Sequence, residues 1–308
     1  MGVPLTSACI THLSIFTNLQ TLSTTLTAGS RIQIPLESVP HNLFPALREP
    51  SRSADSFTHA IDFFGPLLHL SLQKLHFVVL AKPTLHHSEL LWSALGRSCS
   101  TTVLQEILLC TDDNDPGHGP TYVVNPDSIS FLFPFHDLEV LFIGTPTSFK
   151  HIDNTLIKDI ANAWPRLRIL QLHYIHEYEH TKVTISGLLP LSNCAYLESL
   201  EITLDSTIPD TSVLRKADGS FYNGSLSRLA VGNLPIKDPE AVTSFLSNIF
   251  PNLTDIEAWC SEHGDSGRDL EWGTETELWE RVWDSYLTLV NIRRQERGLM
   301  PRAQGVRC

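Results

Sequence analysis

The segment Leu167-Arg168-Ile169-Leu170-Gln171-Leu172 carries the pattern that decides the fold, with leucine at its first, fourth and sixth positions. Its last three residues alternate between apolar and polar, which is typical of a strand with one buried face. The same spacing returns six more times, with first positions 27 to 34 residues apart: Leu72/Leu75/Phe77, Leu104/Ile107/Leu109, Leu138/Leu141/Ile143, Leu197/Leu200/Ile202, Leu226/Leu229/Val231 and Leu253/Ile256/Ala258. A pattern that recurs along the whole chain predicts a repeat architecture.

A stretch with helical spacing and then a junction that contains proline separate successive strand patterns. Proline keeps the residue before it out of the α region, so the junction ends one helix and precedes the next strand. Three junctions share an aromatic-Pro-x-Leu form: Phe44-Pro45-Ala46-Leu47, Trp164-Pro165-Arg166-Leu167 and Phe250-Pro251-Asn252-Leu253. Leu19/Leu22/Thr24 and the segment at Leu47 are interpreted as degenerate early copies.

The starts of several helices can be predicted from capping residues. Asp238 followed by Pro239 predicts an N-cap and a first helical residue, because a short carboxylate accepts from free backbone N–H groups and proline lacks one. Asn154 and Ser88 are predicted to cap two further helices in the same way. Residues 184–195 are predicted to form only a short turn.

Strand and helix alternating about every thirty residues predict an α/β fold, a leucine-rich-repeat solenoid with a parallel concave sheet and outer helices. The predicted organisation is a solenoid over 1–260 with degenerate first units, an acidic loop over 261–273, a C-terminal capping helix over 274–298 and a tail over 299–308. The capping helix would begin with the capping box Thr274-x-x-Glu277. An ordinary α/β fold, in which the leucines occupy unrelated core positions, is the alternative.

The charge balance and the cysteines limit the class of protein. The 34 acidic and 22 basic residues give a net charge of −12, which argues against a general nucleic-acid binder because such proteins need a basic surface. No run of about eighteen apolar residues predicts a membrane span. The six cysteines are scattered, and even Cys99 and Cys110 are eleven residues apart, so we expect no CxxC site and an intracellular protein of the cytoplasm or nucleus.

No catalytic constellation is predicted, and we expect neither an enzyme nor a cofactor or metal site. One run stands against this expectation: His176-Glu177-Tyr178-Glu179-His180 matches the H-E-x-x-H motif of zinc hydrolases. That motif works inside a long amphipathic helix, whereas here it follows directly on the strand pattern that ends at Leu172. A surface loop is the preferred interpretation, and a zinc-dependent hydrolase is the alternative.

The ladder of strands and the aromatic-Pro-x-Leu junctions resemble the leucine-rich-repeat region of the fungal, chiefly mushroom-type, F-box-like proteins. Trp279, Trp283 and Arg293-Arg294 fit the same resemblance. It implies that the repeats bind a protein to be ubiquitinated, while an N-terminal F-box recruits an SCF-type ubiquitin-ligase scaffold. The F-box signature is missing, because the segment Thr17–Leu22 already belongs to the first copy of the repeat pattern. We therefore expect a truncated product or a paralogue without that part, and a ligase scaffold as partner only if an F-box lies upstream of Met1.

Residues between the repeated leucines are predicted to face the concave surface and to bind a partner protein. Aromatic and arginine side chains anchor protein interfaces most often. The predicted binding stripe on this surface is Phe142, Gln171, His173, Glu201, Arg228, Glu257 and Trp259. A solvated inner sheet without a dedicated ligand is the alternative.

Overall fold

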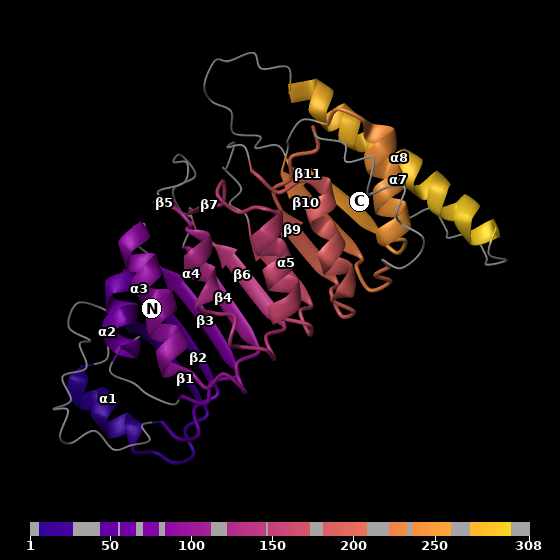
Figure 1. Ribbon diagram of the computed structural model, residues 1–308. Coiled ribbons are helices and arrows are strands. Elements are labelled where there is room, and N and C mark those ends of the chain that lie inside the picture. Colours follow the sequence, from indigo (N-terminus) through magenta and orange to yellow (C-terminus); the bar gives the residue numbers. More distant parts are fainter. Residues whose placement is uncertain are drawn as a thin grey trace. The chain divides into compact units, whose positions relative to one another are not determined.

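Parallel strands recur through the chain where the leucine pattern predicts them. The computed structural model describes residues 6–26, 44–54, 56–65, 70–79, 84–111, 122–145, 147–172, 181–207, 222–232, 236–259 and 272–296. The chain divides into two units, Met1–Phe149 and Lys150–Cys308, and each is a mixed α/β structure of parallel strands and helices (Figure 1).

The described part of the first unit contains one larger sheet and a short strand pair. The sheet has the order β1-β2-β3-β4-β6, and β5 pairs with β7; all the pairings are parallel. The helices α2, α3 and α4 lie on one face of this sheet (Figure 1). In chain order the elements are α1 Ser7–Ser14, β1 Thr21–Leu26, β2 Glu49–Ala54, α2 Phe57–Phe64, β3 Lys74–Val79, α3 Leu85–Ser98, β4 Glu106–Thr111, β5 Tyr122–Val123, α4 Pro126–Ser130, β6 Val140–Gly144 and β7 Thr147–Ser148.

The described part of the second unit repeats the same plan. Its strands run β8-β9-β10-β11, again with parallel pairing. The predicted short turn at 184–195 is a 3-10 helix, η2, that spans Ile185–Asn193. The remaining elements are α5 Asn154–Ala163, β8 Ile169–Leu172, β9 Ser199–Ile202, β10 Arg228–Gly232, α7 Pro239–Ile249, β11 Asp255–Trp259 and α8 Trp272–Glu296.

The repeated apolar positions form the interior of each unit. Every residue of the first six patterns, from Leu72/Leu75/Phe77 to Leu226/Leu229/Val231, is buried. Only Ile256 and Ala258 of the seventh pattern, which is the weakest in sequence, are half-buried. Because side chains alternate along a strand, burying these positions turns the residues between them to the opposite face of the sheet.

Before each of seven strands, one backbone carbonyl accepts two N–H groups from the start of the neighbouring strand. The Gln105 carbonyl accepts from Glu139 at 2.7 Å and from Val140 at 3.0 Å, and the Ser227 carbonyl accepts from Thr254 and Asp255. The carbonyls of Gln20, Arg48, Gln73, Arg168 and Glu198 make the same pair of bonds. This shared bond fixes the register at which each strand begins within its unit.

A buried residue three positions before the first leucine closes a turn ahead of most strands. In four of these turns its carbonyl accepts from the N–H of that leucine, as in Leu167 to Trp164 at 3.1 Å and Leu197 to Cys194 at 2.9 Å. In the last two turns the leucine N–H donates instead to the Asn223 side-chain oxygen and to the Tyr286 hydroxyl. The residues at this position are Phe44, Phe135, Trp164, Cys194, Asn223 and Phe250, none more than 2% exposed. The three aromatic-Pro-x-Leu junctions are therefore one form of a more general turn.

Two of the three predicted helix caps are wrong, and one is confirmed. Asp238 caps α7 by accepting from the Ala241 N–H at 2.9 Å. For α5, however, the cap is Asp153 rather than Asn154, whose side chain bonds to Thr184 instead. Ser88 lies inside α3, which begins at Leu85 behind a Thr84 cap. Short polar residues cluster near these starts, and only the tertiary contacts select among them.

The C-terminal helix α8 lies against α7 (Figure 1). Its Tyr286 hydroxyl is buried, donates to the Phe250 carbonyl at 2.6 Å and accepts from the Leu253 N–H at 2.9 Å. Trp279, Val282 and Val290 are buried on the same helix. The helix begins at Trp272, two residues before the predicted capping box. Among the described residues, no helix has the length and apolar character needed to cross a membrane.

Candidate functional site

The strand residues between the buried leucines form what we call the outward sheet face. We define it as the strand side chains that point away from the helix-covered interior. In the first unit it includes Thr21, Ser23, Lys74, His76, Glu106, Leu108 and Phe142, and in the second unit Gln171, Glu201, Arg228, Ala230 and Glu257.

Three residues of the predicted stripe meet in an ion cluster on the outward face of the second unit. Arg228 of β10 lies between two acidic residues, with Nη1 2.9 Å from Glu201 Oε1 on β9 and Nη2 2.8 Å from Glu257 Oε2 on β11. Glu201 is only 8% exposed, whereas about half of the Arg228 and Glu257 side chains is exposed, at 47% and 48%. The cluster is therefore buried at Glu201 and partly exposed at Arg228 and Glu257.

The strand register explains why these three side chains meet. Glu201, Ala230 and Glu257 occupy one row across the three strands, and Arg228 stands one row earlier, between Ser199 and Asp255. Ala230 is small and leaves the middle of its row free, so the long arginine side chain can reach both carboxylates. An acid-arginine-acid bridge is the result.

The electrostatics of the cluster are dominated by the buried carboxylate. Burial raises the pKa of Glu201 above its ordinary value; the positive charge of Arg228 offsets part of this rise, and the negative charge of Glu257 adds to it. The hydrogen bond to Glu257 raises the pKa of Arg228. Asp255 adds a third acidic group beside a single cation, so the cluster has an excess of negative charge.

We expect a pH-dependent difference in stability between the wild type and Glu201→Gln. A carboxyl whose pKa is higher in the folded than in the unfolded chain stabilises the fold at low pH, and this contribution is lost as the pH rises from 4.5 through the raised value. The free energy of unfolding of the wild type, relative to Glu201→Gln, should therefore fall over this range. Urea unfolding at a series of pH values measures the difference, and a constant or rising difference would contradict the pKa shift.

The other predicted residues lie apart from the cluster or outside the described residues. Gln171 on β8 is the register neighbour of Glu201 and extends the same row. Phe142 belongs to the first unit, where its ring covers Gly144: a Cβ added at Gly144 would lie 2.5 Å from the ring Cε1. His173 lies outside the described residues. Trp259 pairs with Gly232 through the backbone of β11, and its side chain also lies outside the described part.

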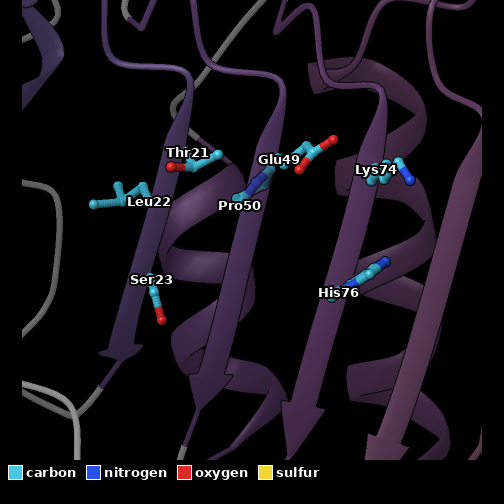
Figure 2. Close-up of a pocket in the computed structure, with 7 residues that line it drawn as sticks. All are labelled: Thr21, Leu22, Ser23, Glu49, Pro50, Lys74 and His76. Carbon is cyan, nitrogen blue, oxygen red and sulfur yellow. The ribbon is translucent and has the colours of Figure 1, made fainter.

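A hollow of about 180 Å³ lies on the first unit, over β1, β2 and β3 (Figure 2). The residues that line it are Thr21, Leu22, Ser23, Glu49, Pro50, Lys74 and His76. Lys74 and His76 extend toward β4, where Lys74 Nζ lies 3.0 Å from Glu106 Oε1 and His76 Nε2 lies 3.5 Å from Glu106 Oε2 (Figure 2). A separation of that length is too long for a hydrogen bond, and the buried Nε2 of His76 has no hydrogen-bond partner among the described residues. The bond to Glu106 raises the pKa of Lys74.

The sequence pattern did not reveal this hollow, because β2 breaks the repeat. Counting from Leu47, the fourth and sixth positions are Pro50 and Arg52, and an arginine at an apolar position hides the strand. The Phe44-Pro45-Ala46-Leu47 junction was the available signal, and β2 does begin two residues after it.

The one motif considered for metal binding, His176-Glu177-x-x-His180, lies outside the described residues. The zinc hydrolase therefore stays a prediction. Among the described residues, no group of three or more His, Cys, Asp or Glu side chains could hold a metal ion. Elemental analysis of the purified chain and of His176→Ala tests the prediction, since a zinc hydrolase would contain stoichiometric zinc and lose it in the variant.

No protein-family model matches the chain, and no curated protein matches it. The function is therefore inferred from the structure.

Proposed function

We propose that this chain is a protein-interaction module that binds a partner protein on its outward sheet face. The observation that carries the proposal is the Glu201–Arg228–Glu257 cluster. Two carboxylates hold the arginine in one geometry while about half of its side chain stays exposed. An arginine ordered before binding loses less conformational freedom in the complex, and arginines are frequent binding hot spots.

The proposal includes a leucine-rich-repeat solenoid as the fold that presents this face. Two regularities support it: the buried leucine positions, and the shared carbonyl that precedes successive strands in both units. A stack of similar strand–helix units gives an extended sheet surface with interchangeable side chains, which is the surface that repeat proteins use for binding. In this scheme α8 is the cap that covers the last repeat.

Within this proposal, the resemblance to F-box-like proteins supplies a cellular role. The chain would be the substrate-recognition part of an SCF-type ubiquitin-ligase adaptor, and the scaffold would bind only through an F-box upstream of Met1. Among the described residues, Cys9, Cys99 and Cys194 are free thiols, in keeping with a location in the cytoplasm or nucleus. Co-purification of the natural full-length product with the ligase scaffold tests this role, and its absence would contradict it.

The binding function is tested by reversing the charge at the centre of the cluster. Arg228→Glu places a third acidic side chain beside Glu201 and Glu257, so we expect at least a tenfold loss of the proteins that co-purify with the tagged chain. The matched control is Arg281→Glu on α8, which makes the same charge change and breaks one exposed ion pair, to Glu240. Quantitative mass spectrometry compares the two variants with the wild type. If no protein is lost selectively from Arg228→Glu, the outward face of the second unit is not the binding surface.

A further inference from the structure

The hollow over β1–β3 has free hydrogen-bond acceptors on one side. Among the described residues, the Glu49 carboxylate forms no salt bridge within 4 Å, although its charge acts on Lys74, and the hydroxyls of Thr21 and Ser23 have no hydrogen-bond partner. Glu49 extends from β2 toward β3 (Figure 2). A ligand that enters here meets acceptors that make no hydrogen bond or salt bridge to other described residues.

The lysine in the lining of the hollow is already engaged. Lys74 is paired with Glu106 on β4 at 3.0 Å, and His76 contacts the same carboxylate. The two negative charges of Glu49 and Glu106 are therefore balanced by the positive charge of only one lysine. The hollow has an excess of negative charge at neutral pH, which disfavours an anionic ligand and favours a cationic one.

The volume of the hollow and the apolar part of its lining restrict the class of ligand further. Drug-sized ligands occupy pockets of about 300–1,000 Å³, and this hollow of about 180 Å³ suits a single side chain. Leu22 and Pro50, which are both buried, contribute apolar surface to the lining. Lysine and arginine have this combination, an apolar stem that packs on carbon atoms and a charged end that only donates hydrogen bonds. One free carboxylate supplies fewer ligands than calcium or zinc ions take.

We infer that the hollow is the binding site for a lysine or arginine side chain of the partner protein, with Glu49 as its counter-ion and Thr21 and Ser23 as further hydrogen-bond acceptors. This inference rests on the proposed function, since it names the chemistry of the partner on the outward face of the first unit. The partner segment that binds here is therefore basic.

The test uses N-acetyl-argininamide and N-acetyl-lysinamide as probes, titrated into the isotope-labelled full chain and followed by the backbone amide signals. We expect saturable shifts at Thr21, Ser23 and Glu49 with at least one of the two probes. Glu49→Gln should weaken this binding about tenfold, as expected for the loss of one charge-assisted pair. Glu89→Gln, on α3, makes the same charge change away from the hollow and should leave the affinity unchanged.

Three results would overturn the inference: no saturable shift at these amides, equal affinity in Glu49→Gln and the wild type, or tighter binding of N-acetyl-glutamate than of both basic probes. Both variants alter side chains that are not buried, and an unchanged amide spectrum away from the hollow shows that they fold. The co-purification experiment with Arg228→Glu is a separate measurement. If that variant loses partner proteins while the hollow binds no basic probe, this inference fails and the proposed function stands. If it loses no partner while the hollow does bind a basic probe, the proposed function fails and the binding site in the hollow stands.

Discussion

Leu109→Ala is expected to lower the free energy of unfolding by about 2–5 kcal/mol, because it removes three buried carbon atoms and leaves a cavity. Leu109 is 1% exposed and is the last leucine position of its pattern, in the middle of the sheet of the first unit. Its strand, β4, has neighbours on both sides, β3 and β6, so the surrounding side chains have little freedom to close the cavity. The cost should therefore lie well above that of an exposed leucine.

Leu90→Ala is the matched control, since it makes the same chemical change in the same unit. Leu90 lies on α3 and is 38% exposed, so we expect a loss below about 1 kcal/mol. Urea-induced unfolding of both variants, followed by circular dichroism, measures the difference. Equal losses would show that the repeated leucine positions are no more important to the fold than a surface leucine.

Asn223→Ala should be nearly as damaging, with an expected loss of about 3 kcal/mol, because it leaves several buried backbone groups without partners. The Asn223 side chain is buried and donates to the Cys194 carbonyl at 2.7 Å. Its oxygen accepts from the N–H groups of Ser225 at 2.8 Å and Leu226 at 3.0 Å. This one amide thus closes its own turn and ties it to the preceding one.

Asn252→Ala provides the control for the same substitution. Asn252 occupies the next turn, is only half-buried, and has a single side-chain bond, from Nδ2 to the Gly224 carbonyl at 2.8 Å. Losing one such bond should cost about 1 kcal/mol. Thermal or urea unfolding of the two variants side by side measures the comparison. A loss for Asn252→Ala as large as that for Asn223→Ala would mean that burial of the amide is not the source of its effect.

The sequence alone determined most of the longer strands and which of their residues are buried. Alternation along a strand is a local property, so Leu170 and Leu172 predict their own burial without knowledge of any other segment. The same rule placed Glu201, Arg228 and Glu257 on the opposite face. It failed at β2, where Arg52 interrupts the pattern, and at the starts of α3 and α5, where neighbouring polar residues compete to cap the helix.

Only the tertiary structure decided how the outward residues combine. The meeting of Arg228 with Glu201 and Glu257 depends on the register between three strands and on the small Ala230 between the two acids. The hollow depends likewise on the placement of β1, β2 and β3 beside one another. Neither arrangement follows from spacing along the chain, because the groups that meet are separated by about thirty residues and are positioned by hydrogen bonds between strands rather than within them.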